Sequence, residues 1–265
     1  MRFTCFVRDD PQSRKCYELL YSYLTYSGWV KDDAKPQMVI TIGGDGTVLA
    51  AIHQYIDILN NVAFIGINTG SLGFYSNYRI EEFNQFVNDL LSGKPQFEYK
   101  RMIEAIVDND IQQPIHALNE VRIESNIKAA VIQVAIDNHP FELISGNGLC
   151  ISTQAGSTAY NRSLGGAIID EKLGQNVGLQ ISEILPVHNS SYRSLKSSFV
   201  LAPQREVTIY DRSLIGDFGM SMLCYDNQYE SLKGKKQIHV KMSNVVVYFA
   251  YYRSTNYIER IKTLF

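Results

Sequence analysis

Hydrophobic positions in the first 95 residues fall into short apolar runs separated by amphipathic stretches. The runs span residues 2–7, 38–42 and 62–67. The amphipathic stretches, with apolar side chains at helical spacing, span residues 11–28, 48–59 and 80–91. Largely apolar strands that alternate with helices are typical of a parallel sheet with both faces covered. The pattern therefore predicts a Rossmann-like α/β domain.

Individual side chains can be assigned to the buried faces of two of these helices. In the first helix, the side expected to face the sheet carries Leu19, Leu20, Tyr23 and Leu24. In the helix over residues 80–91, it carries Phe83, Phe86, Val87 and Leu90.

From about Gly93 the period changes to two. Ile132, Val134 and Ile136 alternate with polar or small residues, and similar alternation occurs over 207–209 and 237–242. This pattern predicts an antiparallel, mostly β, β-sandwich-like second domain. One interval, residues 178–185, is predicted to be helical. The predicted domains are residues 1–95 and 96–250, with a tail from about 250 to 265 returning to the first.

Composition narrows the class of protein. The chain has 265 residues, 45% of them hydrophobic and 20% charged, with a net charge of −2, as in soluble globular proteins. The sequence has no excess of basic residues that would indicate a nucleic-acid partner. The apolar run 245–252 is too short to span a membrane, and the first residues lack a signal-peptide pattern, so we expect a cytoplasmic protein. The scattered cysteines, without the close pairs of a zinc site, are expected to be free thiols; they are Cys5, Cys16, Cys150 and Cys224.

The segment Gly-Gly-Asp-Gly-Thr at 43–47 lies between two apolar runs. Asp-Gly alone is a strong hairpin signal. Here the segment joins a predicted buried strand to a predicted helix, which indicates an anion site where backbone N–H groups and the helix dipole act together. It is neither the G-x-G-x-x-G fingerprint nor a P-loop with its Lys. Because a carboxylate repels phosphate, Asp45 is interpreted as a base or as part of a magnesium site.

Three further polar groups follow along the chain. They are Asn-Thr-Gly-Ser-Leu-Gly-Phe at 68–74, Leu-Asn-Glu at 118–120, and Gly-Asn-Gly at 146–148 followed by the polar run 152–161. The first follows the third strand, where a parallel sheet exposes its ligand crevice. Each has a structural alternative: a turn with Phe74 in the core, a strand that ends at the surface at Asn119 and Glu120, and a helix start capped by Ser or Thr.

In this order the four groups resemble the NAD kinase family, ATP-dependent kinases that phosphorylate NAD to NADP. The resemblance runs from Ile40 to about Asp226. The Gly-Gly-Asp-Gly-Thr motif is shared with lipid kinases and distantly with phosphofructokinases, whereas Leu-Asn-Glu, Ser-Thr-x-x-Gly-Ser-Thr-Ala-Tyr and the segment 189–193 are more specific. The resemblance implies an α/β N-terminal domain and a β-sandwich-like C-terminal domain, in a homodimer or homotetramer.

The resemblance also implies roles for individual residues. Asp45 would accept the proton of the 2′-hydroxyl of the adenosine ribose while that oxygen attacks the γ-phosphate of ATP. Phosphate binding is implied for Gly43, Gly44, Gly46 and Thr47, with Mg²⁺ or another divalent cation carried in on ATP. NAD binding is implied for Asp45, Gly46, Phe74, Asn119, Glu120, Ser145, Asn147, Ala155, Thr158, Ala159, Tyr160, Ser163, Leu185 and Tyr192. In this set Asn119 and Glu120 would hold the adenosine, Phe74 would pack on the adenine, and Tyr192 would reach a neighbouring subunit's site.

The chain departs from the family pattern in two places. Many members carry Arg-Gly-Asp-Gly where this chain has Ser145-Gly146-Asn147-Gly148, and Pro-Ser or Pro-Thr where it has Gln154-Ala155. A charged pair and a hydroxyl are therefore missing near the dinucleotide. These departures bear on affinity and on the preferred phosphoryl donor.

Two rival functions remain at this point. A lipid kinase of the diacylglycerol or sphingosine type would keep the glycine motif but has no need for Asn119 and Glu120. A non-catalytic NAD(P)-sensing module would account for the departures at 145, 147 and 155, but it has no need for a base at Asp45.

Overall fold

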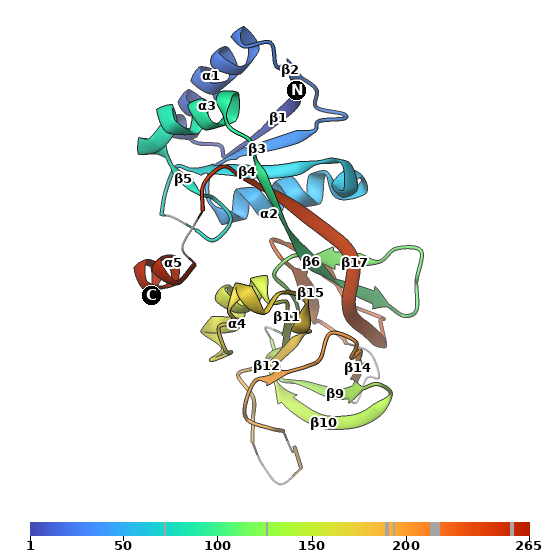
Figure 1. The fold of residues 1–265 in the computed structure, drawn as a ribbon. Helices are drawn as coiled ribbons and strands as arrows, with labels where there is room; N and C mark the ends of the chain where they lie inside the picture. The colour runs from blue at the N-terminus through green and yellow to red at the C-terminus, as the bar shows by residue number, and fades with distance from the viewer. Residues whose placement is uncertain (72, 126, 189–190, 193, 213–217, 255–256) are drawn as a thin grey trace. The chain divides into compact units, whose positions relative to one another are not determined.

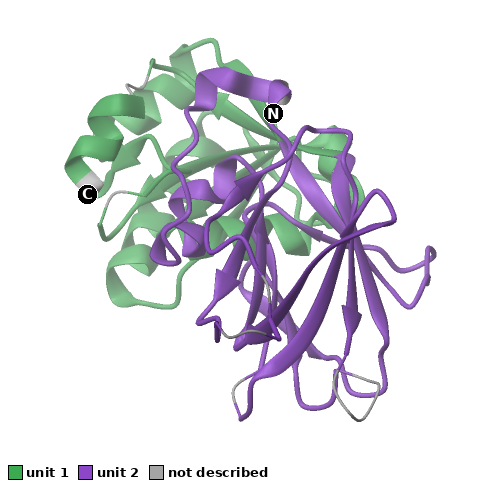
Figure 2. Ribbon diagram, turned by 90° about the horizontal axis from the view of Figure 1, so that it is seen from below, with its two compact units in different colours: residues 1–100, 245–265 green, residues 101–244 purple. Residues whose placement is uncertain are grey.

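The structure is a computed structural model, and it describes residues 1–71, 73–125, 127–188, 191–192, 194–212, 218–254 and 257–265. The chain forms two compact units, residues 1–100 with 245–265 and residues 101–244 (Figure 2). Two long strands, β6 (Gln96–Val107) and β17 (Gln237–Tyr251), contribute residues to both units. The division into domains 1–95 and 96–250, with a tail from about 250 that returns to the first, stays a prediction.

The first unit is built on a parallel sheet (Figure 1). Its strands are β1 (Arg2–Val7), β2 (Val30–Lys31), β3 (Met38–Ile42), β4 (Ala63–Asn68), β5 (Tyr78–Arg79) and the C-terminal part of β17. The order is β2-β1-β3-β4-β17, with β5 also on β4, and each of these pairs is parallel. The helices are α1 (Pro11–Tyr26), α2 (Asp45–Gln54), α3 (Phe83–Ser92) and α5 (Tyr257–Leu264), with 3₁₀ turns η1 (Ile56–Asn61) and η2 (Ile80–Glu82). The predicted α/β fold is confirmed.

Helices cover both faces of this sheet (Figure 1). On one face, Leu20 of α1 and Phe86 of α3 share a buried cluster with Ile40 of β3. Helix α2 lies on the other face, toward which Val39 and Phe64 point because strand side chains alternate. Burial on both faces explains why these strands are apolar throughout.

Two details of the predicted helices are wrong. Helix α1 buries Leu20 and Leu24, but Leu19 and Tyr23 are 47% and 49% exposed, because the buried stripe runs through Ser13 and Cys16 instead. Helix α2 begins at Asp45 rather than at residue 48 and ends at Gln54, where the 3₁₀ turn η1 replaces its expected last residues. The carboxylate of the glycine turn therefore belongs to the first turn of a helix.

The second unit is a mostly β sandwich. One sheet has the order β10-β9-β14-β17, extended by β6 and β7, and the other has the order β13-β12-β11-β8-β15-β16. The strands are β7 (Ile115–Ala117), β8 (Glu120–Glu124), β9 (Ala130–Ile136), β10 (His139–Gly146), β11 (Gly148–Ser152), β12 (Gln180–Ile184), β13 (Phe199–Val200), β14 (Val207–Asp211), β15 (Met222–Tyr225) and β16 (Gln228–Ser231). Short helical segments are η3 (Ala155–Thr158), α4 (Tyr160–Ser163) and η4 (Glu171–Asn176).

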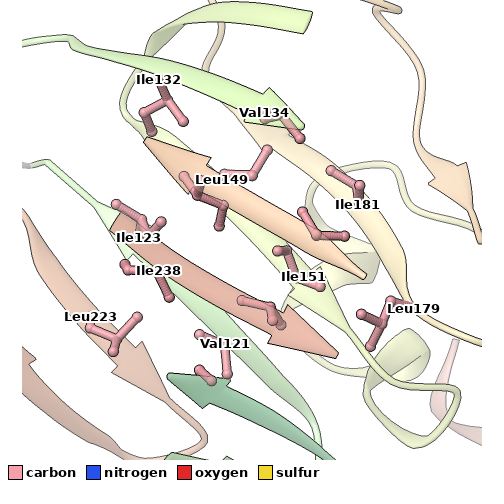
Figure 3. Packing of buried hydrophobic residues seen from close by; sticks show 14 of the residues in the cluster. Val121, Ile123, Ile132, Val134, Leu149, Ile151, Leu179, Ile181, Leu223 and Ile238 are labelled. Atoms are coloured by element: carbon pink, nitrogen blue, oxygen red, sulfur yellow. The ribbon is translucent and has the colours of Figure 1, made fainter. Parts of the chain in front are cut away.

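Apolar side chains from both sheets meet in a single core (Figure 3). Val134 of β9 and Ile238 of β17 come from one sheet, and Ile123, Leu149 and Ile181 come from the other. The predicted mostly β second half, with its alternating strands, is confirmed. Its predicted helix over 178–185 is wrong, because residues 180–184 form β12 between β11 and β13. A strand paired on both sides and buried on both faces loses the simple alternation that identifies it.

Candidate active site

The glycine turn connects β3 to α2 at the carboxyl end of the parallel sheet. Gly44 is the N-cap and Asp45 is the first helical residue. Gly43 donates its N–H to the carbonyl of Ile67 at 3.1 Å. A Cβ atom at Gly43 would lie 2.2 Å from Oγ1 of Thr47, so the packing of the turn itself requires this glycine.

The packing of the fold gives no comparable reason for a glycine at position 44 or 46. A Cβ atom at either position would meet nothing within 4 Å, and neither glycine has a positive φ. In the described part of the chain, no hydrogen bond uses the N–H of Gly44, Asp45 or Gly46. The N–H groups of Gly44, Asp45 and Gly46 lie at the start of a helix, and the two glycines carry no side chain that would obstruct a ligand. Such a set of backbone donors is suited to binding an anion.

Asp45 is held by the backbone of the loop that follows β4. Its Oδ2 accepts the N–H of Phe74 at 2.7 Å, and its Oδ1 accepts the N–H of Tyr75 at 3.1 Å. A Cβ atom on Gly73 would lie 2.1 Å from Oδ1, so this glycine lets the loop approach the carboxylate. Burial raises the pKa of Asp45, and the two N–H groups and the charge of Arg260 oppose that rise.

The C-terminal helix α5 contacts the same loop. Arg260 donates from Nη1 to the carbonyl of Phe74 and from Nη2 to Oδ1 of Asn77, both at 2.7 Å. The Phe74 ring lies 6.1 Å from the ring of Tyr257 and 6.0 Å from that of Phe265, measured between centroids. Phe74 is half-buried rather than a core residue.

In the second unit, Asn119 and Glu120 lie at the start of β8 and are buried, so the alternative of a strand end at the surface is wrong. The backbone N–H of Asn119 donates to Asp226 at 2.7 Å, and its carbonyl accepts the N–H of Thr153 at 2.8 Å. A Cβ atom on Gly156 would lie 2.0 Å from that carbonyl oxygen. The structure therefore brings the Leu-Asn-Glu motif together with the run 152–161.

Glu120 takes part in a compact polar cluster with Arg122, Glu124 and Tyr160. Arg122 donates to Oε1 of Glu120 at 2.5 Å and to Glu124 at 2.6 Å, and its guanidinium lies 4.2 Å from the centroid of the Tyr160 ring. Oε2 of Glu120 is buried and has no hydrogen-bond partner among the described residues. Burial raises the pKa of Glu120 to about 7, with Arg122 lowering it and Asp226 and Glu124 raising it.

A second group in this unit forms around the turn between β10 and β11. The N–H of Asn147 donates to the carbonyl of Ile184 at 2.9 Å, and the carbonyl of Ser145 accepts the N–H of Val187 at 2.6 Å. The side chain of Asn147 donates to the carbonyl of Ser125 at 3.2 Å. Leu185, between these contacts, is 72% exposed with a φ of 44°. Ser145, Asn147 and Leu185 are thus neighbours.

The remaining predicted residues lie near the short helices or in a loop. Ala155 and Thr158 belong to η3, Tyr160 and the exposed Ser163 to α4, and Ala159 joins the two segments. The segment does begin a short helical stretch, and Oγ1 of Thr153 accepts the N–H of Gly156 in its first turn at 3.1 Å, so the alternative of a helix start capped by Ser or Thr describes the local structure. Tyr192 is half-buried, but Asn189, Ser190 and Arg193 of the segment 189–193 lie outside the described residues, as does Leu72.

Three charged residues at these sites were not predicted from the sequence. A signal for Arg122 does exist, because Glu120, Arg122 and Glu124 alternate along one strand and therefore share a face. For Asp226 and Arg260, more than 100 residues separate each from the backbone groups that it binds, and no local spacing indicates such contacts.

Comparison with known proteins places the chain in a family. The family model of the ATP-NAD kinase N-terminal domain matches residues 5–94, and that of the C-terminal domain matches residues 118–251. An NAD kinase of Limosilactobacillus reuteri is 36% identical, over all of this chain and 98% of its own. NAD kinase 1 of Halalkalibacterium halodurans is 34% identical, with the same coverage.

Two solved structures share the fold at low sequence identity. A yeast NADH kinase complexed with NADH matches with a TM-score of 0.81 and 17% identity, covering 99% of this chain and 86% of that one. An NAD kinase from Archaeoglobus fulgidus in complex with ATP matches with a TM-score of 0.75 and 17% identity, covering 100% and 97%. No helix of the described residues is long and apolar enough to cross a membrane, and the four cysteines are free.

Proposed function

This chain belongs to the ATP-NAD kinase family, and we propose how its residues transfer the γ-phosphate of ATP to the 2′-hydroxyl of the adenosine ribose of NAD. The proposal rests on one observation above all. At the first turn of α2, a partly buried carboxylate lies between two glycines that the fold itself does not require.

The open N–H groups of Gly44, Asp45 and Gly46 would bind phosphate oxygens of ATP, with Gly43 and Thr47 shaping the turn. A β-carbon at Gly44 or Gly46 would stand where those oxygens approach, which explains the glycines. The dipole of α2 adds a favourable interaction with the negative charge.

Asp45 is proposed as the general base. Its carboxylate accepts the proton of the 2′-hydroxyl as that oxygen forms a bond to the γ-phosphorus, while the bond to the bridging oxygen breaks and ADP leaves with the electron pair. Each oxygen of a carboxylate can accept more than one hydrogen bond, so the N–H groups of Phe74 and Tyr75 leave Asp45 able to accept a proton. They fix its orientation, which phosphoryl transfer requires.

Glu120 is proposed to bind a ribose hydroxyl of the NAD adenosine. Its Oε1 is held by Arg122, whereas the buried Oε2 lacks a partner and would gain one from the ligand. We propose Phe74 and Asn119 for the adenosine as well, and a lining of the NAD site by Ser145, Asn147, Ala155, Thr158, Ala159, Tyr160, Ser163, Leu185 and Tyr192.

A divalent cation would enter as part of the ATP complex. Among the described residues, no group of three or more His, Cys, Asp and Glu side chains could hold a metal ion. No step is therefore assigned to a resident metal. A cytoplasmic location and a homodimeric or homotetrameric assembly are further parts of the proposal.

The test is a coupled assay with ATP, Mg²⁺ and NAD, read by an NADP-specific dehydrogenase. We expect NADP to form with NAD, and no phosphorylation of diacylglycerol or sphingosine. Turnover of the lipids in place of NAD would support the lipid-kinase alternative. NAD binding by calorimetry without any turnover would support the sensing alternative and contradict the proposal.

A further inference from the structure

The C-terminal helix α5 forms a hydrogen bond to the peptide group that holds the proposed base. The carbonyl of Phe74 and the N–H of Tyr75 belong to the same peptide unit, which is planar and rigid. The carbonyl accepts from Arg260 at 2.7 Å, and the N–H donates to Asp45 at 3.1 Å. A rotation of this plane would break both hydrogen bonds together.

The other contacts of α5 restrain the same loop. Arg260 also binds the buried side chain of Asn77, at the far end of the loop. Tyr257 and Phe265 contact the ring of Phe74, whose own N–H is the second donor to Asp45. Hydrogen bonds in series also polarise one another, so the Arg260 contact strengthens the Tyr75 donor.

On these observations, which rest on the proposed function, we propose that Arg260 is a positioning residue for Asp45. By fixing the Phe74–Tyr75 peptide, it holds the carboxylate in the orientation that accepts the proton of the NAD hydroxyl. The last nine residues of the chain would then contribute to turnover without touching the substrates.

Arg260 also acts on the ionisation of Asp45. Among the described residues it is the charged side chain that influences this carboxylate, and its positive charge lowers the pKa that burial raises. Loss of the charge should raise the pKa of Asp45. A larger fraction of Asp45 would then be protonated at a given pH, and the acid limb of the kcat profile would move to higher pH.

The experiment compares Arg260→Met, Arg260→Lys and a matched control, Lys262→Met, an exposed residue of the same helix. For Arg260→Met we expect kcat to fall roughly ten- to hundredfold, with little change in KM for NAD and with the acid limb displaced to higher pH. In Arg260→Lys the acid limb should stay close to its position in the unmodified protein, because lysine keeps the positive charge. The kcat should still be lowered, because lysine cannot bind Phe74 and Asn77 with two separate N–H groups in the same geometry. Lys262→Met should behave as the unmodified protein.

Two results would overturn the inference. One is a normal kcat and pH profile for Arg260→Met. The other is a loss of kcat with an unmoved acid limb and a lowered Tm, which would show that Arg260 only anchors the helix. Asp45→Asn separates this inference from the proposed function: if that variant turns over normally, the base assignment fails, whereas if it is inactive and Arg260→Met is normal, only the role of Arg260 fails.

Discussion

Asp45 and Glu120 are both buried or partly buried carboxylates, but the fold holds them in opposite ways. In the first unit, both oxygens of Asp45 accept backbone N–H groups. In the second unit, one oxygen of Glu120 accepts from the side chain of Arg122 and the other has no partner among the described residues. Before any ligand binds, each oxygen of Asp45 has a hydrogen-bond partner, whereas Oε2 of Glu120 has none among the described residues.

This difference indicates different functions. A base must keep one orientation through the reaction, and main-chain donors on a rigid loop provide that. A binding residue gains most when the ligand supplies its missing hydrogen bond, because an unpaired buried oxygen is costly. On this view Asp45 acts mainly on turnover and Glu120 mainly on NAD affinity.

The strongest test of this division is Asp45→Asn. Loss of a general base typically lowers kcat by about 10²–10⁴-fold, and NAD binding should be largely kept. Measurement of kcat and of calorimetric NAD affinity for the same preparation checks both parts. A near-normal kcat would show that Asp45 is structural, and lost NAD binding would make it a ligand like Glu120.

The asparagine variant needs a stability control. Its amide oxygen can accept only one of the N–H groups of Phe74 and Tyr75, and its NH₂ group would face the other donor. We expect an unsatisfied donor to cost about 1–3 kcal/mol of unfolding free energy. Kinetics should therefore be recorded well below the Tm of the variant, where the folded fraction is the same as in the unmodified protein.

How far the sequence predicts these two regions follows from the range of the contacts. The strand–glycine turn–helix arrangement around Asp45 is local, and periodicity together with the glycines predicted it. For Asn119 and Glu120 the family resemblance predicted a binding role, but no local pattern predicted their burial, because the partner Asp226 lies 107 residues away from Asn119. The strand at 180–184 was mistaken for a helix because its neighbours in the sheet, and not its own pattern, determine its structure.

A second test concerns the glycines beside Asp45. Gly46→Ala adds a methyl group where the fold leaves open space, so stability should be kept or raised by about 0.5–1 kcal/mol, as for Gly to Ala within a helix. If the N–H groups there bind ATP, the added methyl group should obstruct the approach of a phosphate oxygen and prevent one hydrogen bond to it. The loss of one hydrogen bond to a charged phosphate should raise the KM for ATP roughly ten- to hundredfold.

The control for this test is Gly43→Ala, in which the methyl group would collide with Thr47. Here we expect a lowered Tm as the primary effect. Thermal melts and KM for ATP, measured together, separate the two glycines. An unchanged KM for ATP in folded Gly46→Ala would contradict the phosphate site.

On the side of Glu120, the test is Glu120→Ala. Hydrogen bonds to charged groups contribute about 1.5–3 kcal/mol, so KM for NAD should rise by roughly ten- to 150-fold. The KM for ATP should change little, because the carboxylate holds the acceptor nucleoside. Equal rises in both constants would mean that the assignment to adenosine is wrong, and a large fall in kcat alone would remove the contrast with Asp45.

The last expected effect is the pH dependence of stability that comes from Glu120. Burial raises its pKa to about 7 in the folded protein, against roughly 4.3 in an unfolded chain. Between these values the folded state holds a proton that unfolding releases, so the free energy of unfolding falls as pH rises. The contribution of this group is complete below the unfolded pKa and is lost as pH rises through about 7, and it amounts to at most about 4 kcal/mol.

Glu120→Gln removes this titration, so its unfolding free energy should depend less on pH between 5 and 8 than that of the unmodified protein. Denaturant melts of both proteins across that range measure the difference, with Glu183→Gln, another carboxylate of the same sheet, as the matched control. Equal slopes in the unmodified protein and Glu120→Gln would show that Arg122 keeps Glu120 ionised throughout, against the effects of burial, Asp226 and Glu124. Glu120 would then be ionised before NAD binds. The opposite result would be a weaker dependence of unfolding free energy on pH in the glutamine variant, together with an NAD affinity of the unmodified protein that rises through pH 7. It would mean that NAD binds the carboxylate form of Glu120 and that the fold leaves this group partly protonated near pH 7.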